Sequence, residues 1–375
     1  MKGSPLRVAM VTPWGTKCGI AAYSAALAES LDDDRVTFSI LTEYGSPPET
    51  SELVSTVACW LRYSDDIDAL KRELLTTQAD LIHIQLQWFH SPVVMAEVIE
   101  CALSTGRPVI IQFHNTLADG GSTEALEAIA GPLGRVSRII VHGGADASRL
   151  TSLGLQEKLE MMPLGQVVLE DESAEAVRAR LGIVDRYPVI GTFGYLLPHK
   201  GVLETIRAIA LLRVKYPRIL YVAACAIYPH HMSVLYLQEC RNAILELGLD
   251  AHITLATEFL PERASATLLQ ACDVLALPYL PTQESASAAV RFALSVHRPV
   301  VVTDREIFSA VETGVFTIKD ESPESIASGI EQVLTDPQLA TRLVSGADAL
   351  LATSSWAAVG RQYSALLRAV VGSRS

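Results

Sequence analysis

The segment Phe193-Gly194-Tyr195-Leu196-Leu197-Pro198-His199-Lys200-Gly201 ends an apolar strand that begins at Val189 and leads into an amphipathic helix. A strand, a tight turn and a helix in this order are the repeating unit of an open parallel α/β sheet. Ligands of such sheets bind at the carboxyl ends of the strands, where helix N-termini attract phosphate. The turn therefore offers glycines, an exposed Lys200 at the helix start and a helix N-terminus to a ligand above the sheet.

A second turn of the same kind lies in the stretch from Glu284 to Asp304. It places Glu284 and several small residues where a strand enters a helix, and the chain returns to another buried strand through Arg298-Pro299-Val300-Val301-Val302. Each segment alone is a weak signal, but their order and separation are much stronger. Together they predict a ligand site in the second half of the chain.

The two segments resemble the donor-binding half of family 4 glycosyltransferases, which have the GT-B fold. That family has a Gly-Arg-x-x-x-x-Lys-Gly-like turn, followed further along by a pair of glutamates and a Pro-Val-Val strand. Here Lys200-Gly201 match the turn, Glu284 matches the first glutamate and Pro299-Val300-Val301 match the strand. The resemblance implies an α/β fold of two Rossmann-like, doubly wound parallel-sheet domains that face a central cleft.

Three positions depart from the family pattern. Tyr195-Leu196 stand where the phosphate-binding arginine is expected, Phe292 replaces the second glutamate, and His297 replaces a glycine. Loss of the arginine removes a bidentate phosphate contact, for which Arg291 and His199 are the candidate replacements. Phe292 cannot hydrogen-bond ribose hydroxyls, so we expect it to pack inward.

Length and composition agree with a globular chain of two domains. The chain has 375 residues, 49% of them hydrophobic, and a net charge of −12, which argues against a nucleic-acid partner. The apolar runs are strand-sized and the start leaves no room for a signal peptide, so we expect a cytoplasmic protein with at most peripheral membrane contact. The cysteines lack metal-ligand or redox spacing and are interpreted as reduced core thiols.

Strand and helix patterns alternate nearly throughout and break near residue 165. We therefore predict an acceptor-side domain at 1–165, a nucleotide-sugar-binding domain at 166–355 and a C-terminal helix at 356–375 that crosses back to the first domain. The predicted strands are Leu6–Thr12, Val36–Leu41, Leu81–Ile84, Val109–Phe113, Arg138–Val141, Val189–Phe193, Ile219–Ala224, Ile253–Ala256, Val274–Leu277 and Pro299–Thr303. Helices are predicted at Ile20–Leu31, Asp65–Leu75, Pro92–Thr105, Glu124–Ile129 and Ala145–Leu153, from Gly201 to Lys215, from starts near Ser233, Glu262, Ala286 and Pro323, and at Trp356–Val371.

A glycine-bearing loop joins the first predicted strand to the first helix. The sequence Pro13-Trp14-Gly15-Thr16-Lys17-Cys18-Gly19-Ile20-Ala21-Ala22-Tyr23-Ser24 does not fit the dinucleotide fingerprint. It is similar to the Pro-Trp-x-x-x-Cys-Gly-Ile-Ala opening of one bacterial branch of the same glycosyltransferases, often associated with surface polysaccharide biosynthesis. The alternative interpretation is a turn glycine beside core packing.

His114 follows another predicted strand, in Gln112-Phe113-His114-Asn115-Thr116. The resembled family has a histidine here, near the donor sugar, and an imidazole could hydrogen-bond a sugar hydroxyl or a departing phosphate. A satisfied loop histidine is the alternative. His83-x-Gln85 opens toward the same edge of the sheet. For His142, a functional role and a packing role are equally open from the sequence.

The resemblance implies a metal-independent hexosyltransferase that needs no cofactor and whose substrates are a nucleotide sugar and a glycan or small-molecule acceptor. The predicted catalytic residues are His114, Lys200 and Glu284. The predicted donor-binding residues are Gly15, Gly19, Gly194, Lys200, Glu284, Ser285, Ala286, Ser287 and Arg291. No set of His, Asp and Glu has convincing metal spacing.

Three functions remain open from the sequence. The first is a retaining glycosyltransferase, in which retention is implied by the resemblance alone. The second is a catalytically weak or inactive subunit that binds a nucleotide or a partner glycosyltransferase, which the changes at Tyr195 and Phe292 favour. The third is another GT-B enzyme, such as a nucleotide-sugar epimerase or a phosphorylase.

Overall fold

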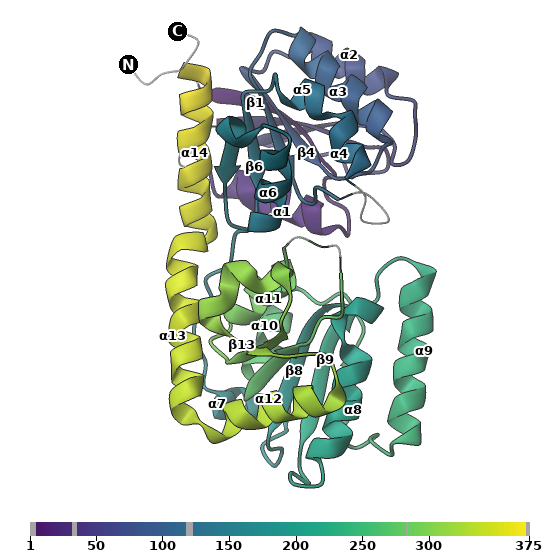
Figure 1. Cartoon of the computed structure of the whole chain (residues 1–375), viewed down its shortest axis with the longest axis vertical. Helices are drawn as coiled ribbons and strands as arrows, with labels where there is room; N and C mark the ends of the chain where they lie inside the picture. Colours follow the sequence, from purple (N-terminus) through teal and green to yellow (C-terminus); the bar gives the residue numbers. More distant parts are fainter. Residues whose placement is uncertain (1–4, 32–35, 118–122, 283, 285, 373–375) are drawn as a thin grey trace. The chain divides into compact units, whose positions relative to one another are not determined.

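The computed structural model describes residues 5–31, 36–117, 123–282, 284 and 286–372 (Figure 1). Internal contacts divide the chain into two compact units. Unit 1 comprises residues 1–165, 283–286 and 354–375, and unit 2 comprises residues 166–282 and 287–353. Within the described residues, no helix combines the length and apolar character that crossing a membrane requires.

Unit 1 contains a seven-stranded parallel sheet in the order β3-β2-β1-β4-β5-β6-β7. Its strands are β1 (Leu6–Val11), β2 (Val36–Glu43), β3 (Val54–Trp60), β4 (Leu81–Leu86), β5 (Val109–Phe113), β6 (Arg138–Val141) and β7 (Leu159–Met161). Its helices are α1 (Gly19–Glu29), α2 (Asp68–Thr76), α3 (Pro92–Ser104), α4 (Glu124–Ala128), α5 (Ala130–Leu133), α6 (Gly144–Ser152), the 3-10 helix η3 (Gln156–Lys158) and α14 (Trp356–Gly372).

The C-terminal helix α14 packs against α1 and one face of the unit 1 sheet (Figure 1). Val359, Tyr363 and Leu367 are fully buried in the same apolar cluster as Val8 and Met10 of β1. Contact between the two helices is close at Gly360, where an added Cβ would lie 2.6 Å from the Ser30 carbonyl oxygen. Glycine is therefore required at this position by the neighbouring backbone.

Unit 2 contains a six-stranded parallel sheet in the order β10-β9-β8-β11-β12-β13. Its strands are β8 (Val189–Tyr195), β9 (Leu220–Ala226), β10 (Ile253–Ala256), β11 (Val274–Leu277), β12 (Val300–Thr303) and β13 (Val315–Ile318). Its helical segments are α7 (Ala174–Leu181), η4 (Pro198–Lys200), α8 (Val202–Leu212), α9 (His231–Glu246), α10 (Glu262–Gln270), α11 (Ala288–Leu294), η5 (Glu306–Gly314), α12 (Pro323–Thr335) and α13 (Pro337–Ser354).

The predicted class, two α/β domains with parallel sheets, is confirmed, and each of the ten predicted strands is present within two residues at either end. Three strands were missed, namely β3, β7 and β13, and all three lie at a sheet edge. An edge strand is covered less completely than a central one, so its sequence lacks the continuous apolar run of a buried strand. Helices α5, α7 and α13 were also missed, and the helix predicted at Gly201–Lys215 is shorter, at Val202–Leu212.

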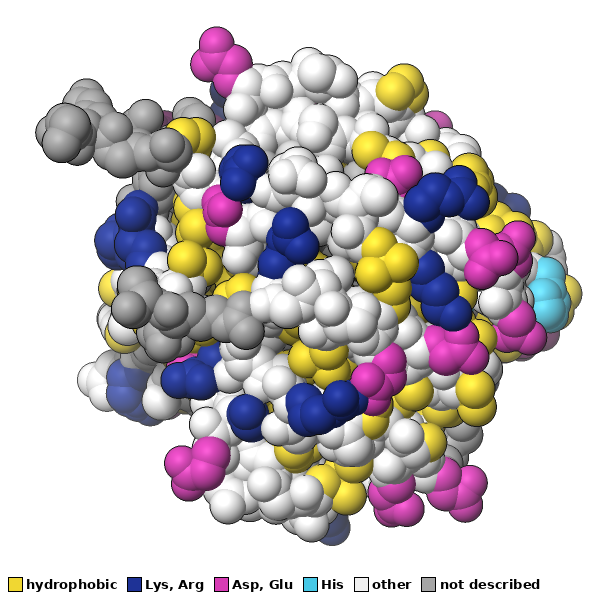
Figure 2. All heavy atoms as spheres, turned by 90° about the horizontal axis from the view of Figure 1, so that it is seen from above, with side chains coloured by type: hydrophobic (Ala, Val, Ile, Leu, Met, Phe, Trp, Pro, Cys, Tyr) yellow, Lys and Arg dark blue, Asp and Glu magenta, His cyan; other side chains and the backbone are white. Residues whose placement is uncertain are grey.

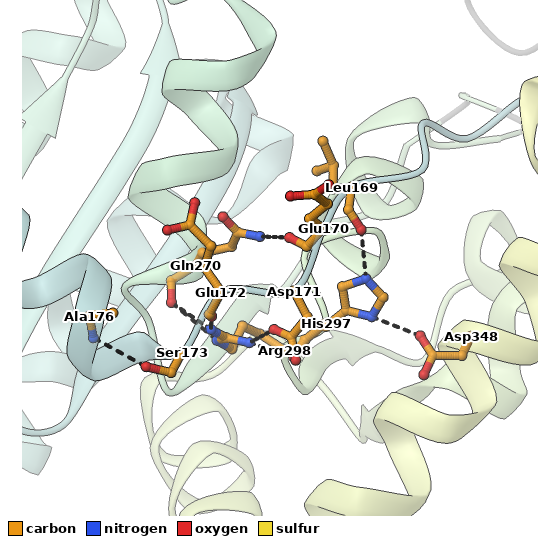
Figure 3. Close-up of polar contacts among 10 residues, drawn as sticks. All are labelled: Leu169, Glu170, Asp171, Glu172, Ser173, Ala176, Gln270, His297, Arg298 and Asp348. Carbon is orange, nitrogen blue, oxygen red and sulfur yellow. Dashed lines mark hydrogen bonds and ion pairs between the residues drawn. The ribbon is translucent and has the colours of Figure 1, made fainter.

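His297 occupies the place of a family glycine and keeps the backbone conformation that favours glycine, with φ 56°. Its Nδ1 lies 2.9 Å from Asp348 Oδ1 of α13, and its Nε2 lies 3.1 Å from the Leu169 carbonyl oxygen (Figure 3). The adjacent Arg298 donates to Asp171 Oδ1 at 3.0 Å and to the Glu172 carbonyl. Side chains at the start of β12 therefore hold the first residues of unit 2 in place.

Charge on the face of the molecule drawn in Figure 2 is mixed. On the face drawn in Figure 2, basic side chains are interspersed with acidic and apolar ones, without a continuous basic area among the described residues. All six cysteines are free thiols; Cys59, Cys225, Cys240 and Cys272 are buried, and Cys18 and Cys101 are partly exposed.

Candidate active site

In unit 2, the predicted phosphate turn is built from the end of β8, the short 3-10 helix η4 and the start of α8. Gly201 has φ 72°, and an added Cβ would lie 2.2 Å from the carbonyl oxygen of Pro278, so the turn depends on glycine here. Gly194 has φ 136° and an added Cβ would lie 3.4 Å from Ala289 of α11. Both predicted glycines are thus required by the backbone, whatever else they do.

Lys200 is the last residue of η4 and is buried, with 7% of its surface exposed. The sequence had indicated an exposed lysine at a helix start, which is wrong. Its ammonium nitrogen lies 4.1 Å from the centre of the Tyr279 ring. A cation over an aromatic face at this distance is attracted to the ring, and burial strengthens the attraction.

Tyr279 was not predicted, although it comes two residues after β11 and therefore lies at the carboxyl end of a parallel strand. Its ring contacts the Lys200 ammonium, its hydroxyl lies 3.0 Å from Ser287 Oγ, and its carbonyl accepts a hydrogen bond from Thr303 Oγ1 at 2.7 Å. The ring of His199 packs edge-on against it, with 6.0 Å between centroids. Tyr279 thus connects the turn after β8 with the start of α11.

Ser287 and Arg291 lie on α11, one turn apart. Ser287 is the N-cap, and its Oγ accepts from the Val290 amide at 3.1 Å. Arg291 has 4% of its surface exposed, and burial lowers the pKa of its guanidinium to about 10. Ser287 therefore has a structural role already, while Arg291 is a buried basic group on the helix that follows the second turn.

The strand order places these residues at a topological switch point. The chain leaves β8 for β9 on one side of the sheet and leaves β11 for β12 on the other, and β8 and β11 are neighbours. Crevices of this kind, outside the carboxyl ends of two strands whose connections diverge, are where open α/β sheets bind ligands. Lys200 follows β8 and Tyr279 follows β11, so both lie at this switch point.

Two of the three departures from the family pattern, Phe292 and Tyr195, have aromatic surroundings. Phe292 packs inward on Phe193, as predicted, with 4.5 Å between ring centroids. Tyr195 contacts Tyr228 and Phe259, at 5.2 Å and 6.2 Å between centroids. Tyr195 therefore stands in an aromatic cluster at the ends of β8, β9 and β10, and contributes no positive charge where the family has arginine.

The second turn is only partly described. Ser285 lies outside the described residues. Residues 283–286, which include Glu284 and Ala286, group with unit 1, whereas Ser287 groups with unit 2. Ala286 packs against the apolar cluster of unit 1. The four residues 284–287 that the sequence assigned to a single donor-binding turn are thus divided between the units.

In unit 1, the loop before α1 contains Gly15 and Gly19. Gly15 has φ 64°, and an added Cβ would lie 2.5 Å from Pro47 Cγ, so this glycine is required by the fold. Gly19, the first residue of α1, has no atom within 4 Å of the position of an added Cβ among the described residues. Gly15 thus fits the alternative of a packing glycine, whereas Gly19 leaves open space above the helix start.

His114 comes directly after β5 and is fixed by three neighbours. Its Nε2 lies 2.6 Å from Gln85 Oε1 of β4. The rings of Tyr23 and His142 lie 5.1 Å and 5.4 Å from its ring, centroid to centroid. Burial holds the pKa of His114 well below its usual value, and the neighbouring His142 and His83 act in the same direction. The neutral imidazole is therefore the form present near pH 7.

Two other histidines of unit 1, His142 and His83, are buried and hydrogen-bonded. His142 is buried, and its Nδ1 lies 2.8 Å from the Met162 carbonyl while its Nε2 lies 3.1 Å from Gln112 Nε2. Because a carbonyl can only accept, His142 donates from Nδ1 and accepts at Nε2. His83 is fully buried with Nδ1 2.5 Å from the Tyr363 hydroxyl. Its Nε2 has no hydrogen-bond partner among the described residues.

Within the described residues, no group of three or more His, Cys, Asp and Glu side chains is arranged to hold a metal ion. The groups that could interact with an anionic ligand are instead basic side chains and backbone amides. In unit 2 these basic side chains are Lys200 and Arg291, both largely buried.

Comparison with known proteins bears on the family and the fold. Residues 173–349, which lie almost entirely in unit 2, match the family model of group 1 glycosyl transferases. Among solved structures, the sucrose-phosphate synthase of Thermosynechococcus elongatus aligns over 98% of this chain and 100% of its own, with a TM-score of 0.80 and 16% identity. The chain has the GT-B fold.

Two further GT-B structures are similar. The Anabaena protein Alr3699/HepE, in complex with UDP-glucose, aligns over 97% of this chain and 100% of its own, with a TM-score of 0.74 and 18% identity. A UDP-forming trehalose-phosphate synthase from Burkholderia xenovorans aligns over 98% and 99%, with a TM-score of 0.74 and 13% identity. No curated protein matches the sequence. At these identities the structures establish the GT-B fold.

Proposed function

We propose that this protein is a retaining glycosyltransferase that moves a hexosyl group from a nucleotide-diphosphate sugar to a saccharide, lipid-linked or small-molecule acceptor. The observation that carries the proposal is the buried Lys200 ammonium, held on Tyr279 beside the switch point between β8 and β11. A fixed cation at the carboxyl edge of a parallel sheet is placed to bind the diphosphate of a nucleotide.

Transfer requires stabilisation of the negative charge that grows on the leaving diphosphate. A preorganised donor in a water-poor site contributes roughly 3–4 kcal/mol by analogy with oxyanion holes. Lys200 is preorganised, because η4 fixes its backbone and the Tyr279 ring fixes its ammonium. We propose that Lys200 supplies this charge, with Arg291 as the second basic group and without a metal ion.

We further propose that His114 and Glu284 contact the donor sugar. His114 is a neutral imidazole, which suits a hydrogen bond with a hydroxyl better than an ion pair with phosphate. Similar structures contain bound UDP or UDP-glucose, which makes UDP sugars the first donors to test. Membership of the bacterial polysaccharide branch and a cytoplasmic location belong to the same proposal.

The test is calorimetric titration of UDP, GDP and their sugars into the full-length protein, with detection of slow donor hydrolysis in the presence and absence of EDTA. Binding of a nucleotide sugar with EDTA-resistant hydrolysis is the expected result. His114→Ala and Glu284→Gln should depress turnover at least tenfold and leave UDP binding nearly intact. A folded protein that binds no nucleotide or nucleotide sugar would overturn the transferase in favour of an inactive subunit.

A further inference from the structure

We infer that Gln85 is a positioning residue that keeps His114 neutral, with its proton on Nε2. The carboxamide oxygen of Gln85 lies 2.6 Å from His114 Nε2. An amide oxygen can only accept, so the ring nitrogen must donate, and Nδ1 of the neutral ring is then the acceptor. The predicted effect of Gln85 on activity rests on the proposed function. The predicted protonation state of the His114 ring does not, because it is observed directly.

The orientation of the Gln85 amide follows from its other neighbour. Its Nε2 lies 4.0 Å from Met10 Sδ, and a thioether is a weak acceptor without a proton to give. Rotation of the amide by 180° would place its oxygen against that sulfur and its NH₂ group against His114. The contact with Met10 therefore favours the orientation in which the oxygen faces His114.

The sheet fixes the distance between the two side chains. Gln85 is 4% exposed on β4, and its backbone is paired with Gln112 of β5. His114 continues β5, and its amide donates to the Leu86 carbonyl at 3.1 Å. Both residues are thus held by the same strand pair, so the side-chain bond forms without ordering a loop.

The use of an amide instead of a carboxylate determines the charge of the ring. His142, His83 and Tyr23 are titratable groups that face His114, and none of these three side chains is a carboxylic acid. Glutamate at position 85 would place a negative charge on His114 Nε2 and stabilise the imidazolium. Gln85 accepts the same hydrogen bond without that charge, so Nδ1 remains an acceptor, suited to a hydroxyl donor and unsuited to a phosphate oxygen.

The experiment is a long-range ¹H–¹⁵N spectrum of the histidine rings in the full-length protein, with His114 assigned from His114→Gln. We expect the wild-type ring to be neutral and protonated on Nε2 from pH 5.5 to 8.5. In Gln85→Glu we expect the imidazolium fraction at pH 6.5 to rise at least tenfold. Gln87→Glu places the same charge two residues further along the chain and should leave the ring form unchanged.

In assays, Gln85→Glu should lower kcat/KM at pH 7 at least tenfold and move the acid limb of the pH profile upward, with UDP affinity changed less than twofold. Gln85→Met, which has no acceptor oxygen, should give a mixture of the two tautomers. A wild-type ring protonated on Nδ1, or a charged wild-type ring at pH 7, would overturn the inference. So would a folded Gln85→Glu variant with the wild-type ring form. These spectra decide the matter even if Gln85→Glu fails to fold or no transfer is detected.

Discussion

The ammonium of Lys200 lies 4.1 Å from the centre of the Tyr279 ring, and only 7% of the lysine surface is exposed. Lys200 lies in the turn after β8 and Tyr279 follows β11, so this pair joins the ends of the two strands. The Tyr279 hydroxyl also contacts Ser287, the N-cap of α11. Burial of a lysine side chain costs free energy of folding unless its charge interacts with a partner or a ligand. Its position therefore has consequences for both stability and transfer.

Replacement of Lys200 by methionine should lower kcat/KM at least tenfold, about 1.4 kcal/mol or more, because the cation that we propose to stabilise the leaving diphosphate is lost. Methionine keeps the apolar stem that packs in the turn, so unfolding should change little. Lys200→Ala should destabilise unit 2 as well, because it leaves a cavity beside Tyr279. Steady-state kinetics and thermal unfolding of both variants separate the two effects.

Lys215→Met is the matched control. Lys215 also lies over a tyrosine, Tyr216, at 5.4 Å, but its side chain is exposed on the surface of unit 2. Its removal should leave kcat/KM within twofold of wild type. Activity within twofold for a folded Lys200→Met protein would remove Lys200 from the mechanism.

Much of the fold could be predicted because strand cores such as Val109–Phe113 and Val274–Leu277 are buried on both faces and read as apolar runs. Edge strands such as β3 lack that run and were missed. The site was predicted where a residue type implies chemistry, as at Lys200. The burial of Lys200 on Tyr279 could not be predicted, because this contact depends on the pairing of β8 with β11, and the register of that pair cannot be read from the sequence.

His297 should stabilise the first segment of unit 2 through its side chain although its backbone is strained. A non-glycine residue at φ 56° costs roughly 1–2 kcal/mol, which the contacts with Asp348 and the Leu169 carbonyl offset. His297→Ala loses the contacts and keeps the strain, whereas His297→Gly loses both. We expect hydrogen exchange of residues 166–173 to accelerate in both variants, and His297→Ala to be less stable than His297→Gly by about 1 kcal/mol.

Asp348→Asn provides an independent check, because it keeps the size of the side chain and removes its charge. Exchange in residues 166–173 should accelerate in this variant too, though less than in His297→Gly. Equal stability of the alanine and glycine variants would show that the backbone at position 297 is relaxed. Unchanged exchange in all three would show that the contacts in Figure 3 do not hold the segment.

Unit 1 should lose stability in acid because of His83. Burial lowers the pKa of His83 to about 3, below the value near 6.5 of an unfolded histidine. The folded state therefore binds a proton on His83 less readily than the unfolded state does. The contribution of neutral His83 to the free energy of unfolding is fully present above pH 6.5. It is lost as the pH falls from 6.5 toward 3, by up to about 1.4 kcal/mol per pH unit. Burial of His114 acts in the same direction.

Hydrogen exchange of β4 and β5, measured between pH 4 and 7 and corrected for intrinsic rates, tests this dependence. In His83→Gln, the stability of these strands should depend less steeply on pH, even if the variant is less stable than wild type at pH 7. His231→Gln, at the exposed start of α9, should leave the slope unchanged. An identical slope in His83→Gln and wild type would show that His83 is not the titrating group.

Phe292 leads to the final prediction, which concerns nucleotide affinity. Its ring packs on Phe193, so it cannot bind ribose hydroxyls. If no other residue replaces the missing carboxylate, UDP should bind with a Kd of about 100 μM to 1 mM, near −4 to −5.5 kcal/mol. Affinity should fall with added salt, because phosphate contacts at Lys200 would supply most of it. Calorimetry at two salt concentrations measures both quantities.

Restoring the family residue should not restore ribose binding. In Phe292→Glu a carboxylate would replace a ring packed on Phe193 in the apolar cluster of unit 2, which should destabilise the unit by roughly 1–3 kcal/mol. Phe292→Leu keeps an apolar side chain and serves as the control, with UDP affinity within threefold of wild type. Tenfold tighter UDP binding by Phe292→Glu would show that the position still faces the ribose. A sub-micromolar, salt-insensitive complex of the wild-type protein would instead reveal a ribose contact elsewhere, and would assign most of the donor affinity to groups other than Lys200.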